Sequence, residues 1–143
     1  MNLKTIHNVF FIGIGGVGMS ALARYFALDG KVVGGYDKTP TLITQSLIEL
    51  GIHVQFKIDL NQINEQFFNS KDTLIVFTPA ISESNAILEY FRTHDFQVLK
   101  RSEVLGLVTE YTQCLAVAGT HGKTTTCSIL GHLLFACNEK VTA

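Results

Sequence analysis

Four closely spaced glycines interrupt an apolar run near the start of the chain, in the stretch Gly13-Ile14-Gly15-Gly16-Val17-Gly18. Val9 to Ile12 has the β-branched and aromatic content of a buried strand, and Met19 to Ala27 shows apolar residues at helical spacing. Glycines in this spacing between a strand and a helix are typical of a phosphate-binding turn, because they permit a tight turn and a close approach of the ligand to the backbone. The stretch therefore predicts a βα unit whose loop holds an anion at the start of a helix.

An acidic residue, Asp37, ends the next apolar run, Lys31 to Tyr36. Dinucleotide-binding domains place an acid at this position near a ribose hydroxyl. The order of strand, glycines, helix, strand and acid predicts that the loop binds a dinucleotide or a nucleoside diphosphate. A glycine-rich turn that binds nothing, with Asp37 as a solvated turn residue, is the alternative interpretation.

The strand and helix signals continue to about Thr109 and predict five short strands that alternate with helices. Strands are expected at 9–12, 31–36, 52–56, 73–77 and 97–99. A second helix is expected to begin at Thr39-Pro40-Thr41, with a hydroxyl cap and Pro in the first turn. Further helices are expected over 61–68, over 85–94 and after a cap at Ser102. Their predicted apolar faces are Leu42, Ile43, Leu47 and Leu50; Ile63, Phe67 and Phe68; Ile87, Leu88 and Phe91; and Val104, Leu105 and Val108. This alternation is typical of an α/β fold with a Rossmann-like, doubly wound parallel sheet.

Two more loops follow strand ends, at the edge where open α/β sheets bind ligands. Pro79 forces the chain out of the sheet, so Thr78 is a candidate for contact with the ligand, with simple turn chemistry as an equal alternative. Arg101 follows the fifth strand and can pair with a phosphate or a carboxylate. A surface ion pair of Arg101 with Glu103 or Glu110 is the open alternative.

A second glycine loop follows another apolar run, Cys114 to Ala118, which predicts a strand. The loop is Gly119-Thr120-His121-Gly122-Lys123-Thr124-Thr125, and a helix with Cys127, Leu130, Leu133 and Leu134 on one side comes after it. In such a P-loop the backbone N–H groups wrap phosphates, the Lys reaches the β and γ oxygens, and the Thr hydroxyl holds Mg²⁺. The usual pattern has Gly where Val117 stands, so this loop is a variant, and a chance Gly-Lys-Thr at a helix start is the alternative.

The predicted domains are a complete one over 1–110 and the first strand, loop and helix of a second, truncated α/β domain over 111–143. A P-loop domain needs several more strands than these residues provide. We therefore expect residues beyond about Thr112 to self-associate through an unpaired strand or to stay mobile.

Composition excludes several classes of function. The chain has 143 residues, 47% of them hydrophobic, and a net charge of -1, which gives no attraction to nucleic acid or to an anionic membrane. We recognise no signal peptide and no apolar run of the roughly 20 residues that span a bilayer. Cys114, Cys127 and Cys137 lack a Cys-x-x-Cys spacing, so we expect buried free thiols in a cytoplasmic protein whose partners are small molecules.

The two loops in this order resemble the Mur ligases of bacterial cell-wall synthesis. The resemblance lies in Ile12 to Ser20, Thr78 to Ile81, Arg101 to Glu103 and Ala118 to Thr126. It implies that the first domain holds the UDP of UDP-N-acetylmuramate and not NAD. The residues implied in this binding are Gly13, Gly15, Gly16, Val17, Gly18, Met19, Asp37, Thr78, Ala80, Arg101 and Ser102.

The resemblance also implies an ATP site with Mg²⁺ in the second loop. Its residues are Gly119, Thr120, His121, Gly122, Lys123, Thr124 and Thr125, with Lys123 and Thr124 catalytic and Thr124 on the metal. Such ligases pass the γ-phosphate to the muramoyl carboxylate, and the amine of L-alanine attacks the acyl phosphate. We expect the chain alone to bind the UDP-sugar without ligating it.

Three other interpretations remain open from the sequence. A ligase that recycles murein tripeptide shares the string Gly-Thr-His-Gly-Lys-Thr-Thr. An NAD-dependent oxidoreductase would account for the pattern from Gly13 to Asp37 equally well, but it would leave Lys123 without a function. A stand-alone nucleotide-sensing module is the third.

Overall fold

The structure is a computed structural model that describes residues 3–139. The chain divides into two compact units, Met1–Tyr111 and Thr112–Ala143. Residues 1–2 of the first predicted domain and 140–143 of the second lie outside the described part.

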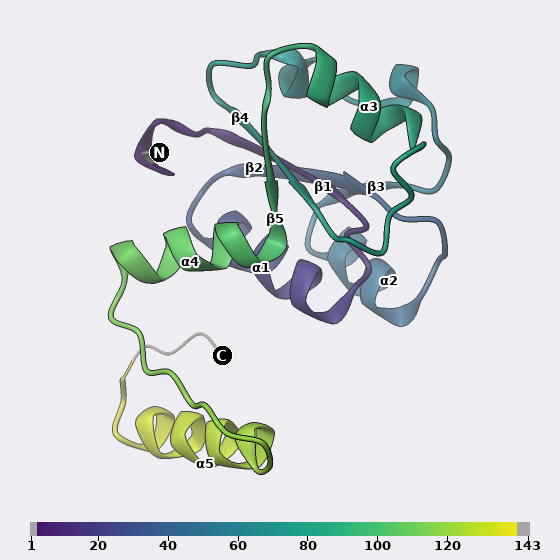
Figure 1. Cartoon of the computed structure of the whole chain (residues 1–143). Coiled ribbons are helices and arrows are strands. Elements are labelled where there is room, and N and C mark those ends of the chain that lie inside the picture. Colours follow the sequence, from purple (N-terminus) through teal and green to yellow (C-terminus); the bar gives the residue numbers. More distant parts are fainter. Residues whose placement is uncertain (1–2, 140–143) are drawn as a thin grey trace. The chain divides into compact units, whose positions relative to one another are not determined.

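The first unit is built on a five-stranded sheet with the order β3-β2-β1-β4-β5 (Figure 1). Its strands are all parallel, and they are β1 (Asn8–Ile12), β2 (Val32–Tyr36), β3 (His53–Gln55), β4 (Thr73–Phe77) and β5 (Gln97–Lys100). β1 lies in the middle and is buried along its whole length, as expected for a strand covered on both faces. The predicted Rossmann-like sheet is confirmed.

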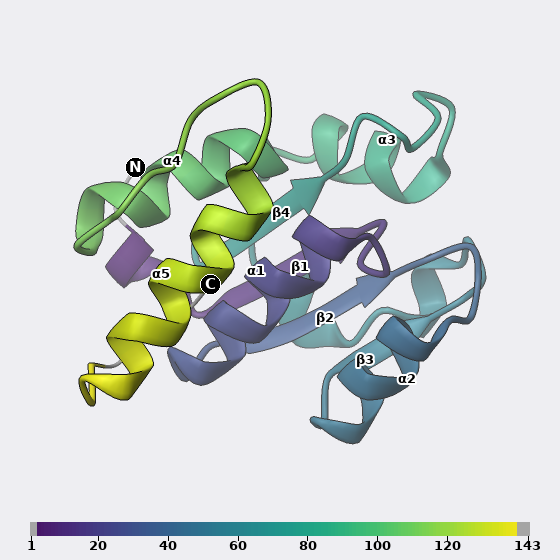
Figure 2. The ribbon, with the colours of Figure 1, turned by 90° about the horizontal axis from the view of Figure 1, so that it is seen from below.

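Helices cover both faces of this sheet. One face carries α1 (Val17–Leu28), α2 (Leu42–Glu49) and α4 (Arg101–Tyr111), which lie on the near side of the sheet in Figure 2. The other face carries α3 (Ala86–Thr93) and two 3-10 turns, η2 (Leu60–Gln62) and η3 (Glu65–Phe68). A third turn, η1 (Leu3–Thr5), precedes β1.

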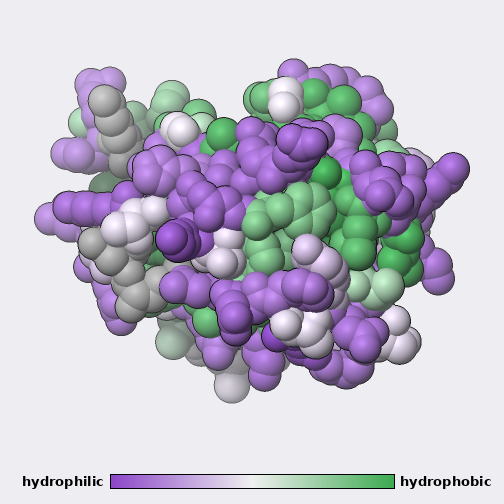
Figure 3. Space-filling view, turned by 90° about the horizontal axis from the view of Figure 1, so that it is seen from above, coloured by the Kyte–Doolittle hydropathy of each residue, from purple (hydrophilic) through white to green (hydrophobic). Residues whose placement is uncertain are grey.

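Two hydrophobic clusters fill the space between sheet and helices. Phe11 and Phe26 belong to the cluster under α1, and Phe10, Phe67 and Phe91 belong to the cluster under α3. Phe10 contacts both Phe67 and Phe91, at ring-centroid distances of 5.3 and 5.8 Å. Seen from the side of α3, the surface is mostly hydrophilic, with hydrophobic side chains gathered toward its middle (Figure 3).

The local sequence explains most element ends in this unit. Gly30, with φ +79°, follows the C-cap of α1, and Asn85 caps α3 by accepting from the N–H groups of Ile87 and Leu88. The Thr41 and Thr44 side chains form a reciprocal capping box at the start of α2. Pro40 therefore lies before the cap, and the prediction that it occupies the first turn is wrong.

Three other predictions about helices are wrong. Residues 61–68 lie in two separate 3-10 turns, because short turns after Asp59 and Asn64 are enough to bring Ile63, Phe67 and Phe68 to the core. Ser102 does not cap α4, which already begins at Arg101; instead the Glu103 carboxylate accepts from the Lys100 N–H at 2.6 Å. On the predicted faces, Leu42, Leu50 and Leu105 are exposed, since Thr44, Leu47, Val104 and Val108 already fill the space against the sheet.

The second unit contains one helix among its described residues, α5 (Lys123–Ala136). The predicted strand Cys114 to Ala118 is absent, because a strand exists only when hydrogen-bonded to a neighbour and no partner strand is present in the described part of this unit. Cys114, Cys127 and Cys137 are free, as predicted, but exposed and not buried. No described residue of α5 is buried, so its apolar side has no core to cover.

We predict that Gly35→Ala destabilises the first unit by about 1–3 kcal/mol. A Cβ at this position would lie 2.6 Å from the Phe11 carbonyl oxygen and 2.9 Å from Ile14 Cδ1, in the middle of the sheet. Gly106→Ala is the matched control, because it lies in α4 with nothing within 4 Å and gains helix propensity. Urea unfolding should show a loss for the first variant and no loss for the second; equal stability of the two would contradict the packing described.

Candidate functional site

Strand register brings four of the predicted residues to one edge of the sheet. Ile12 of β1 pairs with Tyr36 of β2 and with Phe77 of β4, and Phe77 pairs with Lys100 of β5. The residue that directly follows each of these strands is a predicted site residue: Gly13, Asp37, Thr78 and Arg101. The carboxyl ends of four parallel strands therefore place these residues in one row. Ligands bind at this edge in open α/β sheets.

The glycine loop turns sharply between β1 and α1. Gly13 has φ +91°, which favours glycine, and the N–H groups of Gly13 and Ile14 both donate to the Tyr36 carbonyl, at 2.7 and 3.0 Å. Gly16 is the N-cap of α1 without a side-chain cap, and the first bond of the helix runs from the Ser20 N–H to the Gly16 carbonyl.

The start of α1 leaves backbone donors available. Within residues 3–139, the N–H groups of Val17, Gly18 and Met19 have no acceptor. Val17 is exposed, whereas the Met19 side chain is buried, so Met19 offers only its backbone. Three open donors at the positive end of a helix dipole form a site that favours an anion.

The Asp37 carboxylate is bound to the same loop. Its oxygens accept from the Gly15 N–H at 2.7 Å and from the Thr39 N–H at 3.0 Å. Burial, followed by the charge of Asp37, raises the pKa of the neighbouring Tyr36 hydroxyl. The Asp37 carboxylate is thus fixed to the glycine loop at Gly15, and the open donors begin at Val17.

Arg101 lies against the first turn of α1. A Cβ placed on Gly18 would be 3.1 Å from both Cδ and Nη1 of Arg101, so the guanidinium lies beside the open donors. Among the described residues Arg101 has no ion-pair partner, and the alternative of a surface pair with Glu103 or Glu110 is wrong. A guanidinium next to free N–H groups is suited to bind phosphate.

The loop after β4 closes over Gly13. A Cβ on Gly13 would lie 2.7 Å from Thr78 Cγ2 and 3.3 Å from Ile81 Cδ1. Sequence reasoning did not single out Ile81, nor Thr44, whose Cγ2 would lie 2.9 Å from a Cβ on Gly15. Both are apolar contacts made across the fold, and no local pattern marks them.

Two predicted residues are not brought to the glycine loop by any described contact. Ala80 and Ser102 are exposed on the loop after β4 and on the first turn of α4. Their assignment to a ligand remains a prediction.

The second glycine loop is described within its own unit. Gly122 has φ +77° and is the N-cap of α5, and the first bond of that helix runs from the Thr126 N–H to the Gly122 carbonyl. The Lys123 ammonium folds back over the loop and donates to the carbonyls of Gly119 and Thr120, at 2.6 and 3.3 Å. His121 Nδ1 lies 3.2 Å from the Thr120 hydroxyl. The Lys123 ammonium thus lies over the loop that the sequence predicts to bind phosphates.

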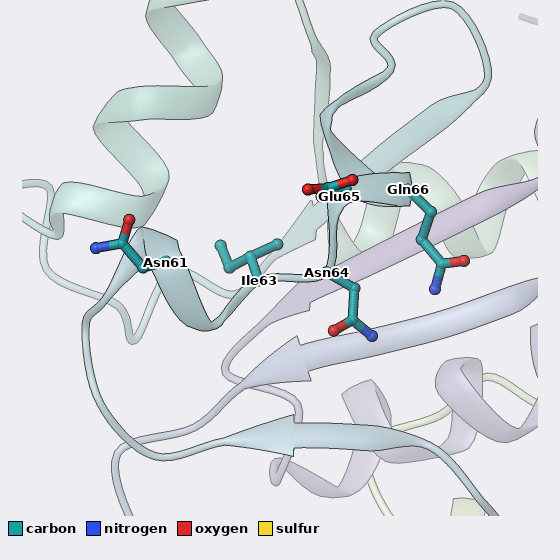
Figure 4. A pocket seen from close by; sticks show the side chains of 5 residues that line it. All are labelled: Asn61, Ile63, Asn64, Glu65 and Gln66. Carbon is teal, nitrogen blue, oxygen red and sulfur yellow. The ribbon is translucent and has the colours of Figure 1, made fainter.

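A shallow pocket elsewhere does not compete with these loops as a site. It is lined by Asn61, Ile63, Asn64, Glu65 and Gln66 at η2 and η3, and their side chains diverge (Figure 4). A binding site needs polar groups that converge on a ligand. The described residues also contain no cluster of three or more metal-binding side chains and no helix long and apolar enough to cross a membrane.

The Mur ligase family, catalytic domain, matches residues 8–112 of the chain. The parallel sheet with helices on both faces makes the first unit a Rossmann-like α/β domain. The chain belongs to the Mur ligase family. Its relatives include UDP-N-acetylmuramate--L-alanine ligases of Flavobacterium psychrophilum, 55% identical over 100% of this chain, and of Porphyromonas gingivalis, 56% identical over 88% of it. The chain covers 32% and 28% of these relatives, so it spans about a third of their length.

Solved structures show the same fold. The UDP-N-acetylmuramate-alanine ligase of Thermotoga maritima is 30% identical with a TM-score of 0.78, over 92% of this chain and 30% of that one. The murein peptide ligase of Psychrobacter arcticus has a TM-score of 0.80 at 24% identity, over 92% of this chain and 27% of that one, which shows the fold alone.

We predict that Asp37→Ala speeds amide exchange at Gly15. The substitution removes the acceptor of the Gly15 and Thr39 N–H groups, and hydrogen bonds to a charged group contribute about 1.5–3 kcal/mol. Lys38→Ala, an exposed neighbour, is the control. NMR exchange rates that are unchanged at Gly15 would show that the carboxylate does not hold the loop.

Proposed function

We propose that this chain is the UDP-sugar-binding part of an ATP-dependent ligase that joins L-alanine to UDP-N-acetylmuramate in peptidoglycan synthesis. The observation that carries the proposal is the row of Gly13, Asp37, Thr78 and Arg101 along one sheet edge, in a chain 55% identical to such ligases. In this function residues 1–110 bind the UDP-sugar, and residues 111–143 begin the ATP-binding domain.

The chemistry of the first site suits a nucleoside diphosphate. The open N–H groups of Val17, Gly18 and Met19 and the Arg101 guanidinium supply positive potential for two phosphates. The Asp37 carboxylate already accepts from the Gly15 N–H. It therefore repels phosphate from the Asp37 side of the site and can accept a hydrogen bond from a neutral donor of the uridine. The ligand is thereby oriented, with phosphates toward Arg101 and the nucleoside toward Asp37.

The second loop fits the phosphates of ATP. Lys123 lies over the loop, and the N–H groups of Lys123, Thr124 and Thr125 have no acceptor in the described part of the chain. Gly119, Thr120, His121 and Gly122 form the turn, and the Thr124 hydroxyl would hold Mg²⁺, which neutralises phosphate charge when bound.

Activation of the muramoyl carboxylate explains the need for both sites. A carboxylate is a poor acyl donor because its oxygen is a poor leaving group. Transfer of the γ-phosphate therefore comes first and gives an acyl phosphate, from which phosphate leaves when the amine of L-alanine attacks. Lys123 stabilises the charge of that transfer. We expect a cytoplasmic enzyme, since ATP is its energy source.

A ligase that attaches murein tripeptide is the second candidate. The tripeptide ligase structure from Neisseria meningitides is 29% identical with a TM-score of 0.76. Both candidates act on the same UDP-sugar, so this chain would bind it in either case. The amine accepted by the full-length enzyme, L-alanine or the tripeptide, separates them.

We predict that the chain binds UDP-N-acetylmuramate in calorimetry and does not bind NADH. Arg101→Ala should weaken binding about tenfold or more, because a charge-assisted bond to phosphate is lost. Gly15→Ala should abolish binding, since its Cβ would lie 2.8 Å from the Asp37 carboxylate and displace it.

Lys123→Ala is the control and should leave UDP-sugar binding unchanged, because Lys123 belongs to the other unit. Circular dichroism checks that each variant is folded. NADH binding without a response to the UDP-sugar would overturn the proposed function, and equal losses from Arg101→Ala and Lys123→Ala would overturn the division between two sites.

A further inference from the structure

The loop between β4 and α3, residues 78–85, carries two of the contacts to the glycine turn. Thr78 and Ile81 pack on Gly13. Most of its hydrogen bonds stay within the loop: the Ile81 N–H donates to the Thr78 carbonyl, and the Asn85 N–H to the Ser82 carbonyl, both at 3.0 Å. These bonds shape the turns but do not fix the loop to the body of the domain.

Arg92 contacts the chain on both sides of the Thr78–Ile81 turn. Its guanidinium carbon lies 5.0 Å from the ring centroid of Phe77, the residue just before the loop, and it forms an ion pair with Glu83 within the loop. Arg92 lies in the last turn of α3, and side chains on a helix lean toward its N-terminus, so the long Arg reaches back to the loop. Phe77 is buried and gives the guanidinium a fixed surface to rest on.

We propose that Arg92 is a positioning residue for the UDP-sugar site, because it holds Glu83 and Phe77 together and so keeps Thr78 and Ile81 on Gly13. The role in ligand binding rests on the proposed function, whereas the clamp on the loop does not. Arg92 lies outside the predicted ligand contacts and acts through the loop.

The electrostatics agree with this geometry. The hydrogen bond and charge of Arg92 lower the pKa of the Glu83 carboxyl, and the charge of Lys100 lowers it further, so Glu83 stays ionised at neutral pH. An exposed ion pair adds little to global stability. Its effect is expected in the local opening of residues 78–85, which requires far less energy than unfolding the unit.

The test compares Arg92→Ala with Arg24→Ala in the whole chain. Arg24 is the matched control, since it lies in α1 on the opposite face of the sheet and binds the Ser46 hydroxyl at 2.8 Å. Arg92→Ala should raise hydrogen exchange of residues 78–84 about three- to tenfold in the ligand-free chain, and raise the Kd for UDP-N-acetylmuramate by a similar factor. Arg24→Ala should change neither.

Arg92→Lys supplies a readout that a purely structural role would not move. Arg92→Lys keeps the ion pair with Glu83, so its exchange rates and Kd should lie between those of the wild type and Arg92→Ala. The difference between Arg92→Lys and Arg92→Ala should disappear at high salt, because salt screens the ion pair. Unchanged exchange in residues 78–84 with Arg92→Ala, or a rise spread over the whole unit, would overturn the clamp. If the wild type fails to bind the UDP-sugar, the proposed function fails, while the exchange measurement still decides the clamp.

Discussion

The register of the parallel strands is the constraint on which the site depends. Because Ile12, Tyr36, Phe77 and Lys100 are paired across the sheet, the residues that follow them emerge in one row. Parallel strands also send every following helix back from this edge, so that the helix N-terminus of α1 points to it. A shift of one residue in any pairing would turn a strand's core residues to the wrong face, so the buried clusters fix the row.

Charges of both signs are divided along this row. Asp37 is held by backbone N–H groups at one end, and Arg101 lies beside Gly18 and the open donors at the other. A ligand with a neutral nucleoside and a charged diphosphate matches this division. The loop after β4 packs on Gly13 in the middle of the row, and Arg92 holds that loop through its ion pair with Glu83. Positioning and charge thus come from separate residues, which allows their effects to be measured separately.

Family membership agrees with this arrangement. Relatives about three times as long are ligases, and the glycine loop of α1 is followed in this chain by a second loop with Lys123 and Thr124. The described part of the second unit has a formed loop and helix but no sheet. Residues 114–118, which precede the second glycine loop, form neither helix nor strand. The two units thus differ in packing, because the first is built on a sheet and no described residue of α5 is buried.

Local sequence patterns were enough to predict the fold class, the two glycine loops and most element positions. Glycine spacing, apolar periodicity and capping residues act over a few residues, so the sequence predicted the loop Gly13 to Gly18, the hydroxyl cap before α2 and the apolar face of α3. Local patterns failed where packing decides: at residues 61–68, at exposed Leu42 and Leu105, and at the start of α4, where Glu103 and not Ser102 binds the backbone.

Which distant side chains meet depends on the packing of the whole fold. The contacts of Gly15 with Asp37 and Thr44, of Gly18 with Arg101, and of Arg92 with Phe77 and Glu83 join segments that share no sequence pattern. Strand pairing and core packing bring them together, and these are properties of the whole sheet. The exposure of Cys127 on α5 has the same cause, since a helix buries its apolar side only when another layer covers it.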